Sequence, residues 1–194
     1  MHWIDPACLP ETRGKLTQFL LNPHGELDGF ILDHARQVHF PPHLAKQVAK
    51  HIAIGDRVRI RGVKPRDADI VAAVTLTSAQ GKEIVDEGPQ HAHHEHRAER
   101  DARQMDVEGE VVLSLYGPKG ELRGALLEGG TSLRMPPHAA TELTAYLTPG
   151  AYVQAWGQGV KNRFGSVRQS RWRKSIISSM KEAALSRTWP SPGK

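Results

Sequence analysis

Apolar residues recur along the first part of the chain in short runs, and each run ends at a turn residue. The segments KLTQFLLN (15–22) and ELDGFILD (26–33) are separated by Pro-His-Gly, which is typical of a β-hairpin with glycine in its turn. The next segment, RQVHF (36–40), alternates apolar and polar residues and directs Gln37 and His39 outward. The pattern therefore predicts three successive strands.

A helical pattern follows the third strand. After Pro-Pro-His, Leu44, Val48 and Ile52 recur at the spacing of one helix face. Proline has no amide hydrogen and a fixed φ, so Pro-Pro ends a strand and begins the first turn of a helix. Alternation returns in GDRVRIRG (55–62), and DIVAAVTLTS (69–78) supplies a fifth strand.

The same pattern occurs twice. Residues 14–62 align without a gap with residues 109–157 at an offset of 95, and about 15 of the 49 pairs are identical. This period is too long for a solenoid and indicates two copies of a small domain. The polar stretch EGPQHAHHEHRAERDARQ between the copies is typical of a linker. We therefore predict a first domain over 11–88, a His-rich linker over 89–104, a second domain over 105–178 and a C-terminal tail over 179–194.

Three strands, a helix and two further strands follow the order of the OB-fold, a partly open five-stranded barrel. Gly29 and Gly124 lie in the middle of predicted strands, where a small barrel needs a bulge or a sharp bend. In the second copy Ala139, Leu143 and Leu147 continue the helical stripe. The sequence therefore predicts an all-β protein with short helices, built from two tandem five-stranded OB-fold-like barrels.

The string FLLNPHGELDGFILD, followed by VHFPPHL and IGDRVRIRG, resembles a group of bacterial proteins of no established function that are built from tandem OB-fold-like domains. The resemblance covers roughly residues 12–175 and is carried by the repeated P-x-G-E-x-x-G and P-P-H motifs. It implies the fold and a bacterial, cytosolic setting. It carries over no catalytic residues.

Charge and composition narrow the functional classes. The net charge of +5 and the pI near 9.5 permit a polyanionic partner. No apolar run is long enough for a signal peptide or a membrane span, and the single cysteine, Cys8, suits a reducing compartment. We therefore expect a cytoplasmic protein with no membrane partner.

The loop between the fourth and fifth strands often contacts ligands in OB-folds, and cations gather around it in both copies. Cations that neutralise phosphates, with aromatic rings that stack on bases, are what single-strand binding requires. The candidate nucleic-acid-binding residues are Arg57, Arg59, Arg61, Lys64 and Arg66 in the first copy and Lys161, Arg163, Phe164, Arg168, Arg171, Trp172 and Arg173 in the second. A solvated basic face is the alternative.

Two aromatic residues and two histidines allow further interpretations. Tyr152 and Trp156 replace outward arginines of the first copy. They either stack on bases or are buried where the barrels meet, and we favour burial.

His43 and His138 follow Pro-Pro in both copies, where packing or hydrogen bonding near the helix start explains them. No Ser-His-Asp, P-loop or dinucleotide motif is present, so we expect no enzyme, no catalytic residues and no cofactor.

The linker contains four histidines within six residues: His91, His93, His94 and His96. Imidazole binds zinc, nickel and copper, so these residues are candidate metal ligands. A polar linker does not hold ligands in a fixed geometry and supplies no neighbouring residues that orient them through hydrogen bonds. A solvated spacer with adventitious divalent metal binding is therefore the favoured interpretation.

These observations predict a non-enzymatic binding protein. The leading hypothesis is weak, sequence-independent binding of single-stranded DNA or RNA through the OB-fold grooves, mainly that of the second barrel. The alternative is a module that binds a protein partner and has no nucleic-acid role.

Overall fold

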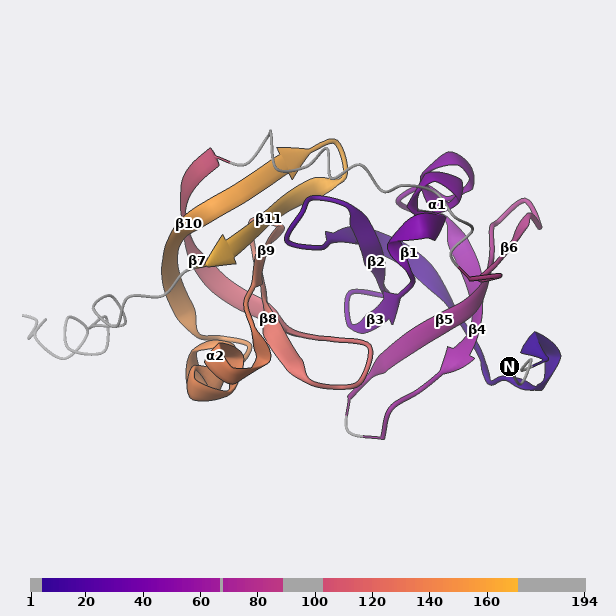
Figure 1. Ribbon diagram of the computed structural model, residues 1–194, viewed down its shortest axis with the longest axis horizontal. Helices are drawn as coiled ribbons and strands as arrows, with labels where there is room; N and C mark the ends of the chain where they lie inside the picture. Colours follow the sequence, from indigo (N-terminus) through magenta and orange to yellow (C-terminus); the bar gives the residue numbers. More distant parts are fainter. Residues whose placement is uncertain (1–4, 67, 89–102, 171–194) are drawn as a thin grey trace, which may run out of the picture.

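Two five-stranded barrels lie side by side, one from each sequence repeat, in the computed structural model (Figure 1). The structure describes residues 5–66, 68–88 and 103–170, with side chains up to 167. The fold class predicted from the sequence is confirmed: strands dominate, and the helices are short.

The first barrel closes through a parallel contact between its third and fifth strands. Its sheet has the order β3-β2-β1-β4-β5-β6, and β3 also pairs with β5. A short helical turn (Pro42–Leu44) and α1 (Ala45–His51) connect β3 to β4. The strands are β1 (Glu11–Leu21), β2 (Leu27–Leu32), β3 (Arg36–His39), β4 (Arg57–Val63), β5 (Ile70–Thr77) and the additional edge strand β6 (Glu83–Val85).

The second barrel repeats this topology in the order β10-β11-β9-β8-β7, and β11 pairs with β9 in parallel. Its helix α2 (Pro137–Glu142) begins at the second proline of the second Pro-Pro. The strands are β7 (Arg103–Tyr116), β8 (Leu122–Leu127), β9 (Thr131–Arg134), β10 (Tyr152–Asn162) and β11 (Gly165–Ser170). Among the described residues, no helix is long and apolar enough to cross a membrane.

The first proline of each pair, Pro41 and Pro136, has an extended backbone, and the second begins the helical segment, as the strand-to-helix interpretation requires. In the first copy the predicted stripe Leu44, Val48 and Ile52 is buried. In the second copy the expected continuous helix is wrong, because α2 ends at Glu142 and a separate 3-10 turn (Thr144–Tyr146) follows. The hydroxyl of Thr144 donates to the Ala140 carbonyl oxygen, and such back-bonding competes with the regular helix.

Each barrel bends beside the glycine that the sequence marked. The pairing of β1 with β2 shifts register next to Gly29, and that of β7 with β8 shifts next to Gly124. A Cβ atom at Gly124 would overlap the Leu133 carbonyl oxygen on β9, and Gly124 has φ +151°. These are the bulges that allow a five-stranded sheet to curl into a barrel.

The barrels contact one another through equivalent surfaces. Their shared apolar cluster consists of Leu20 and Ile31 from the first barrel and their repeat equivalents Leu115 and Leu126 from the second, with Leu113 packed against it. The turn glycine Gly25 lies against Val160, and its equivalent Gly120 lies near Pro65, the equivalent of Val160. Reciprocal contacts of this kind define a pseudo-two-fold axis between the barrels.

Side chains of the second barrel also complete the core of the first. Val160 and Val167 belong to the first barrel's buried cluster, and the Phe164 ring meets Phe19 edge-on, with centroids 5.5 Å apart. Gln37 donates to the Ser114 carbonyl oxygen at 2.7 Å and accepts from the Tyr116 amide at 2.9 Å. The outward face of β3 is therefore buried between the barrels rather than exposed.

Replacing Gly124 by alanine should destabilise the protein by about 3 kcal/mol, because the new methyl group meets the β9 backbone and the positive φ is strained. Thermal unfolding measures the loss. The matched control is Gly129→Ala, since a Cβ there meets nothing within 4 Å. Equal melting temperatures for the two variants would contradict the role of Gly124 as the bulge glycine.

Candidate anion-binding site

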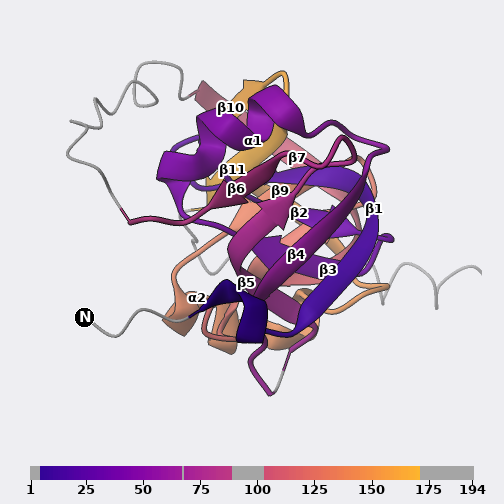
Figure 2. The same ribbon diagram turned by 90° about the vertical axis from the view of Figure 1, so that its right-hand side faces the viewer.

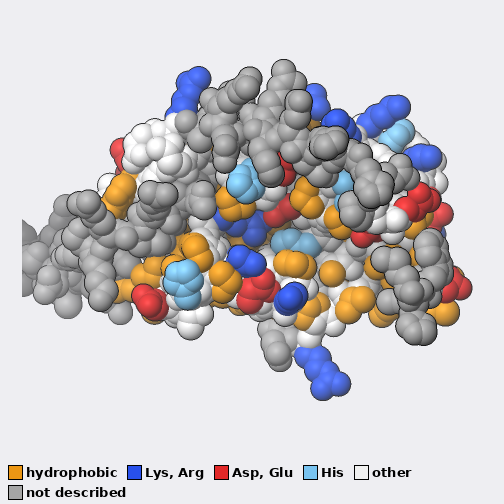
Figure 3. Space-filling model, in the orientation of Figure 1, with side chains coloured by type: hydrophobic (Ala, Val, Ile, Leu, Met, Phe, Trp, Pro, Cys, Tyr) orange, Lys and Arg blue, Asp and Glu red, His pale blue; other side chains and the backbone are white. Residues whose placement is uncertain are grey.

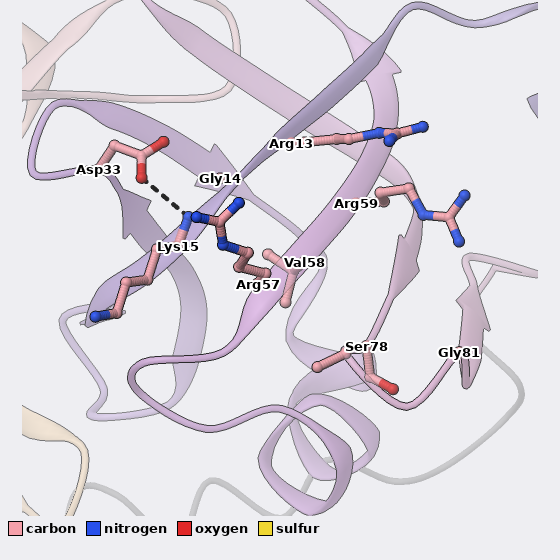
Figure 4. Close-up of a pocket in the computed structure, with 10 residues that line it drawn as sticks. Arg13, Gly14, Lys15, Asp33, Arg57, Val58, Arg59, Ser78 and Gly81 are labelled. Atoms are coloured by element: carbon pink, nitrogen blue, oxygen red, sulfur yellow. Dashed lines mark hydrogen bonds between the residues drawn. The ribbon is translucent and has the colours of Figure 1, made fainter.

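A groove of about 550 Å³ lies on the outer face of the first barrel, between β1, β4 and the turn that joins β5 to β6 (Figure 4). Figure 2 looks onto this barrel from the side away from the second barrel and shows β1 and β4 in front. Gly14 and Val58 lie at the centre of the groove, and the turn contributes Ser78 and Gly81. We call its four cations, Arg13, Lys15, Arg57 and Arg59, the basic stripe.

The strand register places these cations directly opposite one another. Arg13 pairs with Arg59 and Lys15 pairs with Arg57 across the β1–β4 ladder. In Figure 4, Arg13 and Arg59 project at one end, while Lys15 and Arg57 lie at the other. Like charges at directly opposed positions destabilise a sheet, so the basic stripe carries an electrostatic cost that a bound anion would remove.

Asp33 shapes one end of the groove. Its carboxylate accepts the Lys15 amide hydrogen at 3.0 Å and lies so close to Gly14 that a Cβ there would contact it. Asp33 and His34 have φ of 49° and 64°, as in a tight type I′ turn between β2 and β3. The turn thus holds one carboxylate beside the cations.

A second carboxylate, Glu11, takes up part of the positive charge. Glu11 forms ion pairs with Arg13 and with Arg61, and the hydrogen bond from Arg13 lowers the Glu11 pKa below its usual value. Among the described residues, Lys15, Arg57 and Arg59 form no ion pair. These three cations can therefore meet an anionic ligand.

The structure distributes the first-copy candidates over two places. Arg57 and Arg59 line the groove, whereas Arg61 turns to Glu11 and to the Ala7 carbonyl oxygen. Lys64 and Arg66 are exposed in the loop after β4.

The second-copy candidates are not gathered into this groove. Lys161 and Arg163 are exposed at the β10–β11 turn, and Arg163 lies over the Phe164 ring. Phe164 contacts Phe19, so its ring contributes to inter-barrel packing. Arg168 lies on β11, with only its backbone described. Outside the described residues are Arg171, Trp172, Arg173, His91, His93, His94 and His96.

Sequence reasoning missed Arg13 and Lys15 as site residues. The alternation in ETRGKL, with Glu11, Arg13 and Lys15 at every second position, carried the signal. The signal was missed because β1 begins at Glu11, four residues before the apolar run (15–22) from which the first strand was predicted. Only the β1–β4 register shows which cations share a face.

The expected burial of Tyr152 between the barrels is wrong. Tyr152 is 53% exposed at the start of β10, whereas β10 packs against the first barrel through Val160, near its other end. Trp156 on the same strand is half-buried.

The two histidines that follow Pro-Pro differ in their surroundings. His43 hydrogen-bonds the Asp86 carboxylate at 2.9 Å and so connects the helix start to the segment after β6, while His138 is exposed.

The second barrel carries the opposite charge at the positions of the basic stripe. The repeat equivalents of Arg13, Lys15, Arg57 and Arg59 are Glu108, Glu110, Tyr152 and Gln154, which we call the acidic stripe. All four side chains are exposed. The backbone is the same in both barrels: Asp33 donates its amide to the Lys15 carbonyl oxygen and Glu128 donates to that of Glu110, each at 2.9 Å. The charge of the groove is therefore a property of the first barrel alone.

A polar cluster lies buried where the barrels meet. Arg134 approaches Asp28 at 3.5 Å, while His39 Nε2 and Arg134 Nε have no hydrogen-bond partner among the described atoms. Burial lowers the pKa of His39, and the Arg134 charge lowers it further, against the opposing charge of Asp28. Burial also lowers the pKa of Arg134. In Figure 3, cations, carboxylates and histidines meet near the middle of the molecule, where the barrels join.

Arg57→Glu should stabilise the protein by about 0.5 kcal/mol, because an opposite-charge pair with Lys15 replaces a like-charge pair. Thermal unfolding should show a melting temperature higher by about 1–2 °C. Arg66→Glu makes the same charge change in a loop, without a cross-strand partner, and serves as the control. A lower melting temperature for Arg57→Glu than for the control would contradict the electrostatic cost assigned to the stripe.

Acid should destabilise the inter-barrel contact through His39. The unfolded histidine has a pKa of about 6.5, and the folded value is lower, so the unfolded chain takes up the proton first as the pH falls. The free energy of unfolding therefore decreases below about pH 6.5, and His39 has no effect on it well above that pH. Melting temperatures between about pH 7.5 and 5 should fall less steeply in His39→Gln than in the exposed control His138→Gln. Parallel profiles would contradict this.

Within the described part of the chain, no group of three or more His, Cys, Asp or Glu side chains is arranged to hold a metal ion. No protein-family model matches the chain, and no curated protein matches it. The resemblance to tandem OB-fold-like proteins therefore stays a prediction from the sequence, and a function has to be inferred from the geometry and charge of the grooves.

Proposed function

We propose that the protein binds single-stranded nucleic acid, independently of sequence, through phosphate contacts at the basic stripe of the first barrel. The observation that carries the proposal is the opposition of like charges at two positions of the β1–β4 ladder, Arg13 with Arg59 and Lys15 with Arg57, which line one groove. Phosphates placed between these cations would turn repulsion into attraction and release counterions.

The groove suits the phosphate backbone rather than the bases. No aromatic side chain is among the described residues that line it, and base recognition in single strands depends on stacking. Guanidinium groups bind phosphate oxygens in pairs of hydrogen bonds, and the stripe contains three arginines. Contacts of this kind carry no sequence information.

The location of the groove also supports this assignment. The strands β2 and β3, which carry the usual OB-fold binding face, contribute Ile31 and Gln37 to the inter-barrel contact. A flexible single strand can bring successive phosphates into a groove that spans only two β-strands, whereas the phosphates of a duplex are fixed in position.

Neutralising two stripe cations should weaken binding and flatten its salt dependence. Each phosphate contact contributes about −0.7 to the slope of log K against log salt for a single strand. Arg57→Ala with Arg59→Ala should therefore reduce the slope by about 1.4 when each arginine contacts one phosphate. Fluorescence anisotropy of a labelled oligonucleotide, across a salt series from about 50 mM upward, measures both effects.

The matched control is Lys46→Ala with Lys50→Ala, which removes two exposed cations from α1 and the same net charge. This control should retain the native slope, as should Lys161→Ala with Arg163→Ala if the site lies in the first barrel alone. Equal losses in the stripe and α1 variants would show attraction by net charge only. No binding at micromolar protein, or tighter binding of a duplex of the same length, would overturn the proposal.

A second candidate function, interaction with a protein, draws support from Tyr152. This ring is exposed beside carboxylates on the second barrel, and exposed aromatic residues are enriched at protein interfaces. The two functions use different barrels, so one does not exclude the other.

A further inference from the structure

We propose that the acidic stripe of the second barrel binds the basic stripe of a second copy of this chain, so that copies associate head to tail. This interaction goes beyond nucleic-acid binding and does not depend on it. The partner of the acidic stripe is then the basic stripe of another copy, and both stripes lie in the described part of the chain.

The two stripes have the same shape. Arg13 and Arg59 occupy the same register positions on β1 and β4 as Glu108 and Gln154 occupy on β7 and β10. The second pair of each ladder, Lys15 with Arg57 and Glu110 with Tyr152, follows two residues further along. Both stripes therefore present four side chains on two antiparallel strands with equal spacing.

The chemistry of the stripes is complementary. Carboxylates are the preferred partners of guanidinium groups, and an exposed tyrosine ring offers a face on which an arginine can stack. Tyr152 is 53% exposed, and among the described residues Glu108 and Glu110 form no ion pair. The basic stripe thus presents positive charge, and the acidic stripe negative charge, that no ion pair within the described residues neutralises.

The arrangement of the barrels directs this pairing to a different copy. The pseudo-two-fold axis runs through the contact of Leu20 and Ile31 with Leu115 and Leu126, and it places the equivalent stripes on separate barrels. Both stripes are exposed, so within one chain they do not cover each other. A contact between unlike surfaces is heterologous, and it extends into a chain of copies unless a ring closes.

Salt should control the association, because the pairing charges lie at the surface. The Debye length falls from about 30 Å at 0.01 M salt to about 10 Å at 0.1 M and about 3 Å at 1 M. We therefore expect association at low ionic strength and dissociation in high salt. A basic stripe filled by nucleic acid would no longer be free to bind a second copy.

Sedimentation velocity of the full chain, freed of nucleic acid by nuclease treatment and chromatography, tests the proposal. In about 20 mM salt the weight-average sedimentation coefficient should rise with protein concentration, and in about 500 mM salt it should return to the monomer value. Two variants then isolate the stripes. Glu108→Gln with Glu110→Gln removes the acidic charge, and Arg57→Gln with Arg59→Gln removes two of the three basic-stripe cations that form no ion pair among the described residues. Circular dichroism verifies that both are folded.

Each variant alone should remain monomeric at low salt, because each has lost most of the unpaired charge of one stripe. An equimolar mixture of the two should form a 1:1 dimer that grows no further, since the first variant supplies the intact basic stripe and the second the intact acidic stripe. Lys46→Gln with Lys50→Gln, which removes two cations from α1, should associate like the native chain.

Three results would overturn the proposal: a native chain that is monomeric at every concentration in low salt, association that survives in both stripe variants, or a mixture that stays monomeric. The Glu108→Gln, Glu110→Gln variant should bind the labelled oligonucleotide as the native chain does. Failure of self-association is therefore distinguishable from failure of nucleic-acid binding.

Discussion

The contact between the two barrels constrains every other surface of the molecule. Leu20 and Ile31 meet their own repeat equivalents, and Gln37 satisfies two backbone groups of the partner barrel. An apolar cluster with paired polar groups is costly to separate. The strand face that OB-folds commonly use for ligands is thereby taken up within the chain, which is why the site that we propose lies on an outer ladder.

The outer ladders of the two barrels differ in charge. The first barrel places cation opposite cation, whereas the second barrel places Glu108 opposite Gln154 and Glu110 opposite Tyr152. Two copies of one fold therefore show that the backbone does not require the like-charge arrangement. Positions at which a residue lowers stability and contributes nothing to packing are often functional sites.

The pattern of apolar positions predicted the strand order, the Pro-Pro switch and the bulge at Gly124, because alternation and backbone restriction are local properties. The additional strand β6 and the early end of α2 were not predicted, since edge pairing and threonine back-bonding leave no periodic signal. The site was half predicted. Arg57 and Arg59 stood out in one alternating segment, but their partners Arg13 and Lys15 join them only through the β1–β4 register, which a single sequence does not display.

The placement of Val160 and Val167 in the first barrel's core has a consequence for synthesis. Chains fold progressively as they leave the ribosome, N-terminal domains first. Phe19 lacks its ring contact until Phe164 has been synthesised. The core of the first barrel is therefore complete only after almost the whole second repeat has been translated. The duplicated halves are separate in sequence, but they reach their final form together.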